Sequence, residues 1–198
     1  IEKGINEASI YSTDYGFRSA VTSNDEATIS SALENLTSRI NIDRAMLISM
    51  ENDIVAEIVS EGKQSVENIA FDDLIEIADG DGKATSFMNI NGEIYQYTVV
   101  PILAPVPVAW LGMGVLLDRE ELEDIKKTLP LGVDITFRDS NTDRGVGYLE
   151  TTLDDNIIGE VNDRPDGFGQ NVQNQIIRLE DSQFMVQSVE LPSSIETN

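Results

Sequence analysis

The sequence contains no cysteine and no histidine, and these absences exclude several kinds of chemistry. The chain cannot form a disulfide, catalyse a reaction with a thiol or an imidazole, or bind zinc or haem through these side chains. Metals that prefer oxygen ligands, and chemistry based on carboxylates or lysine, remain open. The lack of cysteine also favours a bacterial periplasm over a disulfide-rich secreted context.

Basic residues are scarce as well, with 13 Lys and Arg against 36 Asp and Glu and a formal net charge of -23 at pH 7. Binding to nucleic acid or to an anionic membrane surface requires clustered cations. The composition therefore predicts no nucleic-acid partner and no direct binding to the membrane surface. Hydrophobic residues make up 40% of the 198 residues, which is enough for one large domain or two small modules.

Residues 94–117 imitate a membrane span, because they contain no charged residue and are long enough to cross a bilayer. Pro101, Pro105 and Pro107 would break a helix repeatedly, and acidic residues flank the segment where basic anchors are expected. The segment is therefore predicted to form two strands joined by a proline-containing loop.

Hydrophobic periodicity predicts two helices followed by an antiparallel sheet. Apolar residues at helical spacing indicate an N-terminal helix over 1–21, and Ser23 with Glu26 forms a capping box for a second helix. Asn91-Gly92 is a strong hairpin signal, because a type I′ turn requires positive φ at both central residues. Strands are expected at 45–48, 54–58, 84–90, 93–103 and 108–117, with a short helix at 72–78.

A helix that is capped by Asp118 and Glu121 and ends at Pro130 is the predicted boundary between two modules. The predicted organisation is a helical stalk with a first module over 1–117, a connecting helix over 118–132, and a smaller second module over 133–198. The strands of the second module are expected at 133–137, 149–153, 172–180 and 183–191, with a linker at 154–170.

Three short strings resemble one protein family. They are Asp14-Tyr15-Gly16-Phe17-Arg18-Ser19-Ala20, Gly92-Glu93-Ile94-Tyr95-Gln96-Tyr97 running into Pro101, and Ala109-Trp110-Leu111-Gly112-Met113-Gly114. With the order of the elements, they resemble the double Cache ectodomains of bacterial membrane-bound GGDEF/EAL proteins, which are PAS-like sensor modules. The resemblance covers most of residues 1–190. Compared with this family, the second module is expected to lack its last strand and the exit helix.

This resemblance implies an α+β fold of two stacked PAS-like Cache modules on an N-terminal helix, with no enzymatic activity and no cofactor. It implies a periplasmic ectodomain of an inner-membrane protein, with transmembrane helices outside this segment. A cytoplasmic diguanylate cyclase, phosphodiesterase or histidine kinase would read the signal, so cyclic-di-GMP is an expected output. A small molecule in the membrane-distal module would act on a homodimer formed through the N-terminal helix. The Arg-x-Trp-Tyr pattern of amino-acid-binding Cache modules is absent, which leaves the ligand class open.

Five residues are candidates for the ligand pocket. Tyr95 and Tyr97 share one face of a strand, and the concave face of a PAS-like sheet serves both core and ligand. Phe87 and Trp110 would add apolar walls. Arg18 falls near the apolar stripe of the first helix, where its guanidinium needs a partner, either a ligand carboxylate or an acidic neighbour. The alternative for the aromatic residues is ordinary core packing with no ligand.

The remaining motifs are weaker signals. Asp79-Gly80-Asp81-Gly82-Lys83 resembles the opening of a calcium loop, but Ile90 stands where an EF-hand places its bidentate Glu. A Gly/Asp turn into the next strand is favoured there, and no metal site is predicted. Gly112 and Gly114 lack the third glycine of a dinucleotide loop and are predicted to permit close packing in a strand.

Three alternatives to a ligand sensor stay open. The first is a structural or adhesion module that binds calcium through Asp79 and Asp81. The second is a carboxylate-based hydrolase, although adjacent acids such as those at 72–73 point apart in any regular element, so no catalytic residue is predicted. The third is a sensor without a ligand, whose first module dimerises or meets another periplasmic protein.

Overall fold

The computed structural model describes residues 14–23, 25–40, 42–66, 71–130, 132–139, 147–162, 175–179 and 182–187. The chain divides into two compact units. The first contains the described residues up to Asn91 together with Tyr95–Leu116, and the second contains Gly92–Ile94 and the described residues from Leu117 onward. The division into segments 1–117, 118–132 and 133–198 with separate roles stays a prediction.

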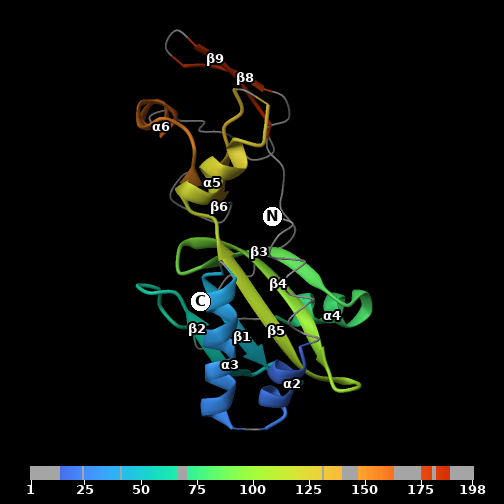
Figure 1. Ribbon diagram of the computed structural model, residues 1–198. Coiled ribbons are helices and arrows are strands. Elements are labelled where there is room, and N and C mark those ends of the chain that lie inside the picture. The colour runs from blue at the N-terminus through green and yellow to red at the C-terminus, as the bar shows by residue number, and fades with distance from the viewer. Residues whose placement is uncertain are drawn as a thin grey trace. The chain divides into compact units, whose positions relative to one another are not determined.

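The first unit is a five-stranded sheet with helices on both faces (Figure 1). The strand order is β2-β1-β5-β4-β3, so β5, the last of these five strands in the sequence, is central. This is the α+β arrangement with an antiparallel sheet that the sequence predicts. The elements are α2 (Tyr15–Val21), α3 (Glu26–Arg39), β1 (Arg44–Ile48), β2 (Ile54–Val59), α4 (Asp72–Asp81), β3 (Ala84–Ile90), β4 (Glu93–Leu103) and β5 (Pro107–Leu116).

The cap of α3 differs from the prediction. Asp25, not Ser23, is the N-cap, and its Oδ2 accepts a hydrogen bond of 3.1 Å from the backbone N–H of Thr28. The Ser23 hydroxyl is used by the preceding helix instead, because it donates to the Ala20 carbonyl at 2.6 Å. The predicted N-terminal helix is described only from Tyr15, and its residues 1–13 lie outside the described residues.

The helix α4 is longer than predicted. It continues through Asp79 to Asp81, and Gly82 ends it in the left-handed conformation with a φ of 76°. Asp79 and Asp81 therefore belong to the last helical turn, where the sequence analysis expected a Gly/Asp turn. The predicted hairpin after β3 is confirmed, because Asn91 and Gly92 have φ values of 54° and 83°.

Strands β4 and β5 confirm the interpretation of residues 94–117 as two strands around a proline loop. No described helix is both long and apolar enough to cross a membrane. Alternation along β5 divides the core between two helical layers. Ala109, Leu111 and Met113 pack in a cluster with α2 and α3, whereas Trp110 packs in a cluster with α4.

The two glycines of β5 make room for an aromatic ring. A Cβ added at Gly112 would lie 2.8 Å from Cε1 of Tyr97, and one added at Gly114 would lie 2.7 Å from Cε2 of the same ring. The ring of Tyr97 therefore lies directly on the backbone of both glycines. This agrees with the prediction that they permit close packing in a strand.

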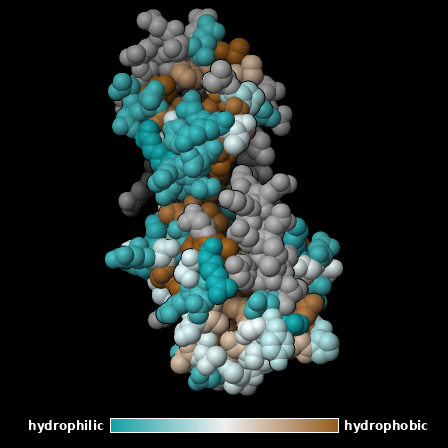
Figure 2. Space-filling view, viewed as in Figure 1, coloured by the Kyte–Doolittle hydropathy of each residue, from teal (hydrophilic) through white to brown (hydrophobic). Residues whose placement is uncertain are grey.

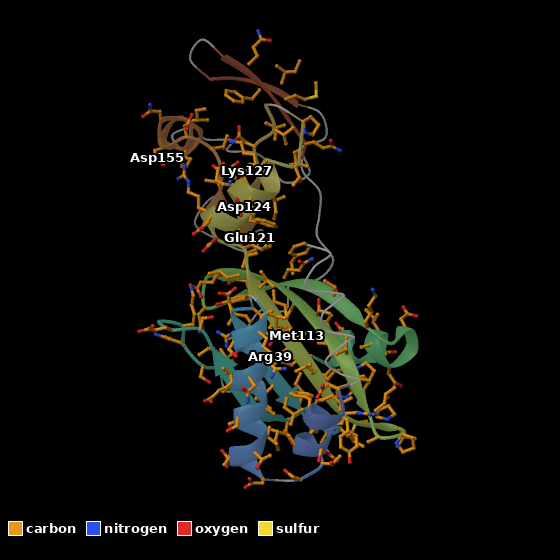
Figure 3. The ribbon with its side chains drawn as sticks, viewed as in Figure 1. Arg39, Met113, Glu121, Asp124, Lys127 and Asp155 are labelled. Carbon is orange, nitrogen blue, oxygen red and sulfur yellow. The ribbon has the colours of Figure 1, made fainter. Side chains whose placement is uncertain are left out.

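The second unit contains small elements. They are α5 (Arg119–Lys126), β6 (Thr136–Asp139), β7 (Gly147–Thr151), α6 (Asp155–Asn162), β8 (Gln175–Leu179) and β9 (Ser182–Val186), with the strands paired as β6-β7 and β8-β9. The predicted cap of α5 is confirmed, because Asp118 Oδ1 accepts from the N–H of Glu121 at 2.9 Å. Lys127 Nζ donates to Asp124 Oδ1 at 2.6 Å just after this helix ends (Figure 3).

The prediction of a linker over 154–170 is wrong for its first half, which forms α6. Ile157 and Ile158 pack against Leu153, and this small apolar cluster stabilises a helix that the Asp- and Asn-rich composition concealed. Residues 163–170 lie outside the described residues.

On the face seen in Figure 2, the described hydrophobic residues appear as separate small patches among hydrophilic ones.

Replacing Gly112 tests the close packing of Tyr97. Gly112→Ala is expected to lower the free energy of unfolding by about 1–3 kcal/mol, because the added methyl group overpacks the core. Gly80→Ala is the control, since Gly80 lies in α4 and nothing lies within 4 Å of its added Cβ. Alanine favours a helix over glycine, so this variant is expected to gain up to about 1 kcal/mol. Urea unfolding measures both, and an unchanged stability of Gly112→Ala would contradict the packing argument.

Candidate functional site

The candidate site is the sheet face that carries Met46, Tyr97 and Trp110, which we call the α4 side because Leu74, Ile75 and Ala78 of α4 pack in the same cluster. Most side chains in this layer are apolar. The polar atoms among them are informative, because buried polar groups in folded proteins are nearly always hydrogen-bonded. Three buried donors on this side have no partner among the described residues: Tyr97 OH, Trp110 Nε1 and Arg44 Nε.

Tyr97 is completely buried. One face of its ring lies on the β5 glycines, and its centroid is 5.3 Å from that of Phe71, which immediately precedes α4. Burial raises the pKa of its hydroxyl far above the ordinary value, since the charged form would lose its hydration. The hydroxyl therefore keeps its proton and can donate a hydrogen bond or accept one.

Trp110 is 2% exposed, yet it lines a surface hollow of about 350 Å³. The indole Nε1 can only donate a hydrogen bond. An acceptor that entered the hollow would relieve the cost of leaving this group unsatisfied, which is about 1–3 kcal/mol. The other residues that line the hollow are Met50, Asn52, Asp72, Ile75, Glu76 and Asp79.

Arg44 is a buried guanidinium, with 1% of its surface exposed. It forms an ion pair with Glu57, donates from Nη2 to the Gln64 carbonyl at 2.8 Å, and places Cζ 5.3 Å from the centroid of the Tyr95 ring. These contacts compensate its charge and use part of its hydrogen-bonding capacity. Its Nε remains without a partner among the described residues.

Glu57 also holds the segment that leads towards α4. Its Oε2 accepts hydrogen bonds from the Ser65 hydroxyl and from the backbone N–H of Val66, the latter at 3.1 Å. With the bond from Arg44 to the Gln64 carbonyl, three consecutive residues are tied to one ion pair. The pair therefore fixes residues 64–66 against the α4 side of the sheet.

The structure brings together three of the five candidates from the sequence. Tyr95, Tyr97 and Trp110 belong to one cluster on the α4 side. Phe87 alternates with Met88, which is in that cluster, so Phe87 points to the opposite face of the sheet. Arg18 is on α2, which packs on the α3 side, and its Nη1 donates to the Leu103 carbonyl at 3.2 Å. A role in ligand binding stays a prediction for all five.

Arg44 was not among the sequence candidates, although a signal for it exists. It begins the run Arg44-Ala45-Met46-Leu47-Ile48 and shares its strand face with Met46 and Ile48 by period-two alternation. A charged residue on an otherwise apolar strand face indicates a buried ion pair or a binding group. The apolar stripe of a helix drew attention to Arg18, while the cation of the buried layer is on a strand.

The acidic residues proposed for calcium do not form a metal site. Asp79 and Asp81 are two residues apart on α4, so their side chains project in different directions. Within the described part of the chain, no group of three or more acidic side chains is close enough together to hold a metal ion.

No protein-family model matches this chain, and no curated protein sequence matches it. Its structure is similar to the crystal structure of the sensor domain of the V. cholerae histidine kinase DctB, with a TM-score of 0.52 and 14% sequence identity. The match covers 74% of this chain and 57% of that one, so the chain spans little more than half the length of its structural neighbour. The similarity shows the PAS-like, Cache-like α+β fold that the sequence predicts.

Removing the counter-ion of Arg44 tests the buried ion pair. Glu57→Ala is expected to lower the free energy of unfolding by about 3–5 kcal/mol, because it leaves a buried charge uncompensated. The double variant Arg44→Met with Glu57→Gln is expected to recover most of this loss, since it removes the charge and keeps an acceptor for Ser65 and Val66. Urea unfolding measures both variants. A loss below about 1 kcal/mol for Glu57→Ala is the value for a solvated pair and would refute this account.

The buried hydroxyl of Tyr97 predicts a loss of stability at high pH. In the unfolded chain the tyrosine hydroxyl has its ordinary pKa of about 10 and loses its proton near that pH. In the folded protein the raised pKa keeps the proton on the hydroxyl. The contribution of this group to the free energy of unfolding is complete below that pH. It declines above it, because the folded state then binds more protons than the unfolded state. Unfolding free energies at about pH 8 and about pH 11 are expected to differ less in Tyr97→Phe than in the wild type. Tyr15→Phe, at a residue that is 80% exposed, is the control and keeps the wild-type difference.

Proposed function

We propose that this chain is the extracytoplasmic sensing region of a transmembrane signalling protein and binds a small molecule on the α4 side of its five-stranded sheet. The fold supports this proposal, because the similar V. cholerae structure is the sensor domain of a histidine kinase. The fold alone does not define a function, so the argument depends on the site.

The observation that carries the proposal is the set of three buried donors without partners among the described residues. Trp110 Nε1 and Arg44 Nε can only donate, and Tyr97 keeps its hydroxyl proton. Donors that folding leaves unpaired in an apolar layer are costly to stability. A ligand with acceptor atoms would pair them, and the hollow beside Trp110 gives it a route of entry.

In this proposal the ligand signals by favouring one of two arrangements of the protein. Residues 64–66 and α4 are the elements that would respond, because the Arg44–Glu57 pair and the aromatic contact between Phe71 and Tyr97 connect both to the sheet. The N-terminal helix in a homodimer would transmit the change across the inner membrane from the periplasm. A histidine kinase, diguanylate cyclase or phosphodiesterase would be the output domain.

A thermal-shift screen of this chain tests the proposal. The panel holds amino acids, small carboxylates, amines, nucleobases and sugars, and a ligand at 100 times its Kd adds about 2.7 kcal/mol to stability. Binding is expected to weaken in Tyr97→Phe and Trp110→Phe, which each remove a donor and keep an aromatic ring. Phe87→Leu, on the opposite face of the sheet, is the control and is expected to bind as the wild type.

Tyr97→Phe separates a ligand role from a structural one. Because the hydroxyl has no partner among the described residues, its removal is expected to leave the stability of the free protein unchanged or higher. Weaker binding by a variant of undiminished stability assigns the hydroxyl to the ligand. If a ligand of this chain binds equally well to both donor variants, the proposed site is wrong.

A further inference from the structure

The hollow beside Trp110 has a strongly acidic lining on one side. Asp72, Ile75, Glu76 and Asp79 follow one another at spacings of three, one and three residues along α4, which places them on one face of the helix. Three of these four residues carry a carboxylate. Asn52, in the turn between β1 and β2, also lines the hollow, and its Nδ2 donates to Asp72 Oδ1 at 2.6 Å.

These carboxylates have no counter-ion in the described part of the chain, since none of the ion pairs found there includes Asp72, Glu76 or Asp79. Like charges at a spacing of four residues, such as Asp72 and Glu76, destabilise a helix. An acid at the C-terminal end of a helix, where Asp79 lies, also opposes the helix dipole. Asp72 is in the first turn of α4, where an acid is favourable to the helix dipole. The stability of α4 does not account for Glu76 and Asp79, and a bound cation would.

A second, independent observation points to a ligand at the same place. Trp110 lines the hollow at 2% exposure, and its Nε1 is a buried donor without a partner among the described residues. None of the acidic residues of α4 accepts a hydrogen bond from this N–H. An acceptor for it would therefore come from a ligand. The aromatic face of a tryptophan also attracts organic cations.

We infer that the hollow takes a small organic amine that carries a neutral oxygen acceptor, as an amino alcohol does. This inference rests on the proposed function and specifies the part of its ligand that occupies the hollow and meets Trp110. The ammonium group would lie against Glu76 and Asp79, which are three residues apart on one face of α4, and the oxygen would accept the Trp110 N–H. An anionic ligand is disfavoured, because none of the described residues that line the hollow is cationic and Glu57 already neutralises the buried Arg44.

The test compares ethanolamine with ethylamine, acetate, glycerol and calcium chloride by isothermal titration calorimetry on the 198-residue chain. Ethanolamine is expected to bind more tightly than the other four. Glu76→Gln and Asp79→Asn are each expected to weaken it by about tenfold or more, the effect of losing one charged hydrogen bond. Asp73→Asn is the matched control, because Asp73 is an exposed acid of the same helix that does not line the hollow. It is expected to change the affinity less than twofold.

Trp110→Phe tests the acceptor half of the inference. It removes the N–H and keeps an aromatic ring, so it is expected to weaken the binding of ethanolamine and leave the affinity for ethylamine unchanged. Equal losses in Asp73→Asn and Asp79→Asn would show general attraction by the acidic chain and overturn the inference.

The other outcomes separate this inference from the proposed function. If acetate or glycerol binds with a dependence on Trp110 and none on Glu76 or Asp79, the amine is wrong and the sensing site stands. If calcium alone binds, and Asp79→Asn abolishes its binding, the hollow is a metal site and the inference fails. If nothing binds here and the wider screen is also silent, both fail.

Discussion

The buried ion pair between Arg44 and Glu57 is the interaction on which the α4 side of the sheet depends. A guanidinium in an apolar layer is tolerated only when its charge is compensated and its donors are hydrogen-bonded. Here the carboxylate of Glu57 compensates the charge and accepts a hydrogen bond from Arg44. The same carboxylate holds Ser65 and Val66, so charge compensation in the sheet and the path of the chain towards α4 have one cause. The pair also leaves this layer electrically neutral, which limits what the neighbouring hollow can bind.

Close packing at the central strand sets the shape of the same layer. Trp110, Gly112 and Gly114 alternate along β5, so one strand face presents a large side chain and then two positions with none. The ring of Tyr97 occupies the space over the glycines, and Trp110, the next residue on the same strand face, lines the hollow. A polar atom on either ring is thereby positioned by backbone geometry, which is more rigid than a network of side chains.

Local signals in the sequence predicted most of the first unit and less of the site. Period-two alternation and the Asn91-Gly92 turn determine strands and hairpins within a few residues, so they are visible without tertiary contacts. The choice of Asp25 over Ser23 as a cap depends on where the preceding helix ends, and α6 depends on a cluster with Leu153. Whether Arg18 or Arg44 lies in the buried layer on the α4 side depends on which face of the sheet each element covers. In the sequence, one charge on a strand face is also harder to recognise than a charge within the apolar stripe of a helix.

The acidic wall and the neutral layer also differ in what they contribute to recognition. Carboxylates exposed on α4 attract any cation at long range, an effect that salt screens, whereas the buried Trp110 N–H discriminates at short range by the acceptor it meets. The helix α4 joins the two, and no side chain caps its N-terminus at Phe71. A cation between Glu76 and Asp79 would remove their repulsion and stabilise this helix. Occupancy of the hollow would then change the order of α4, the element whose other face packs on the sheet.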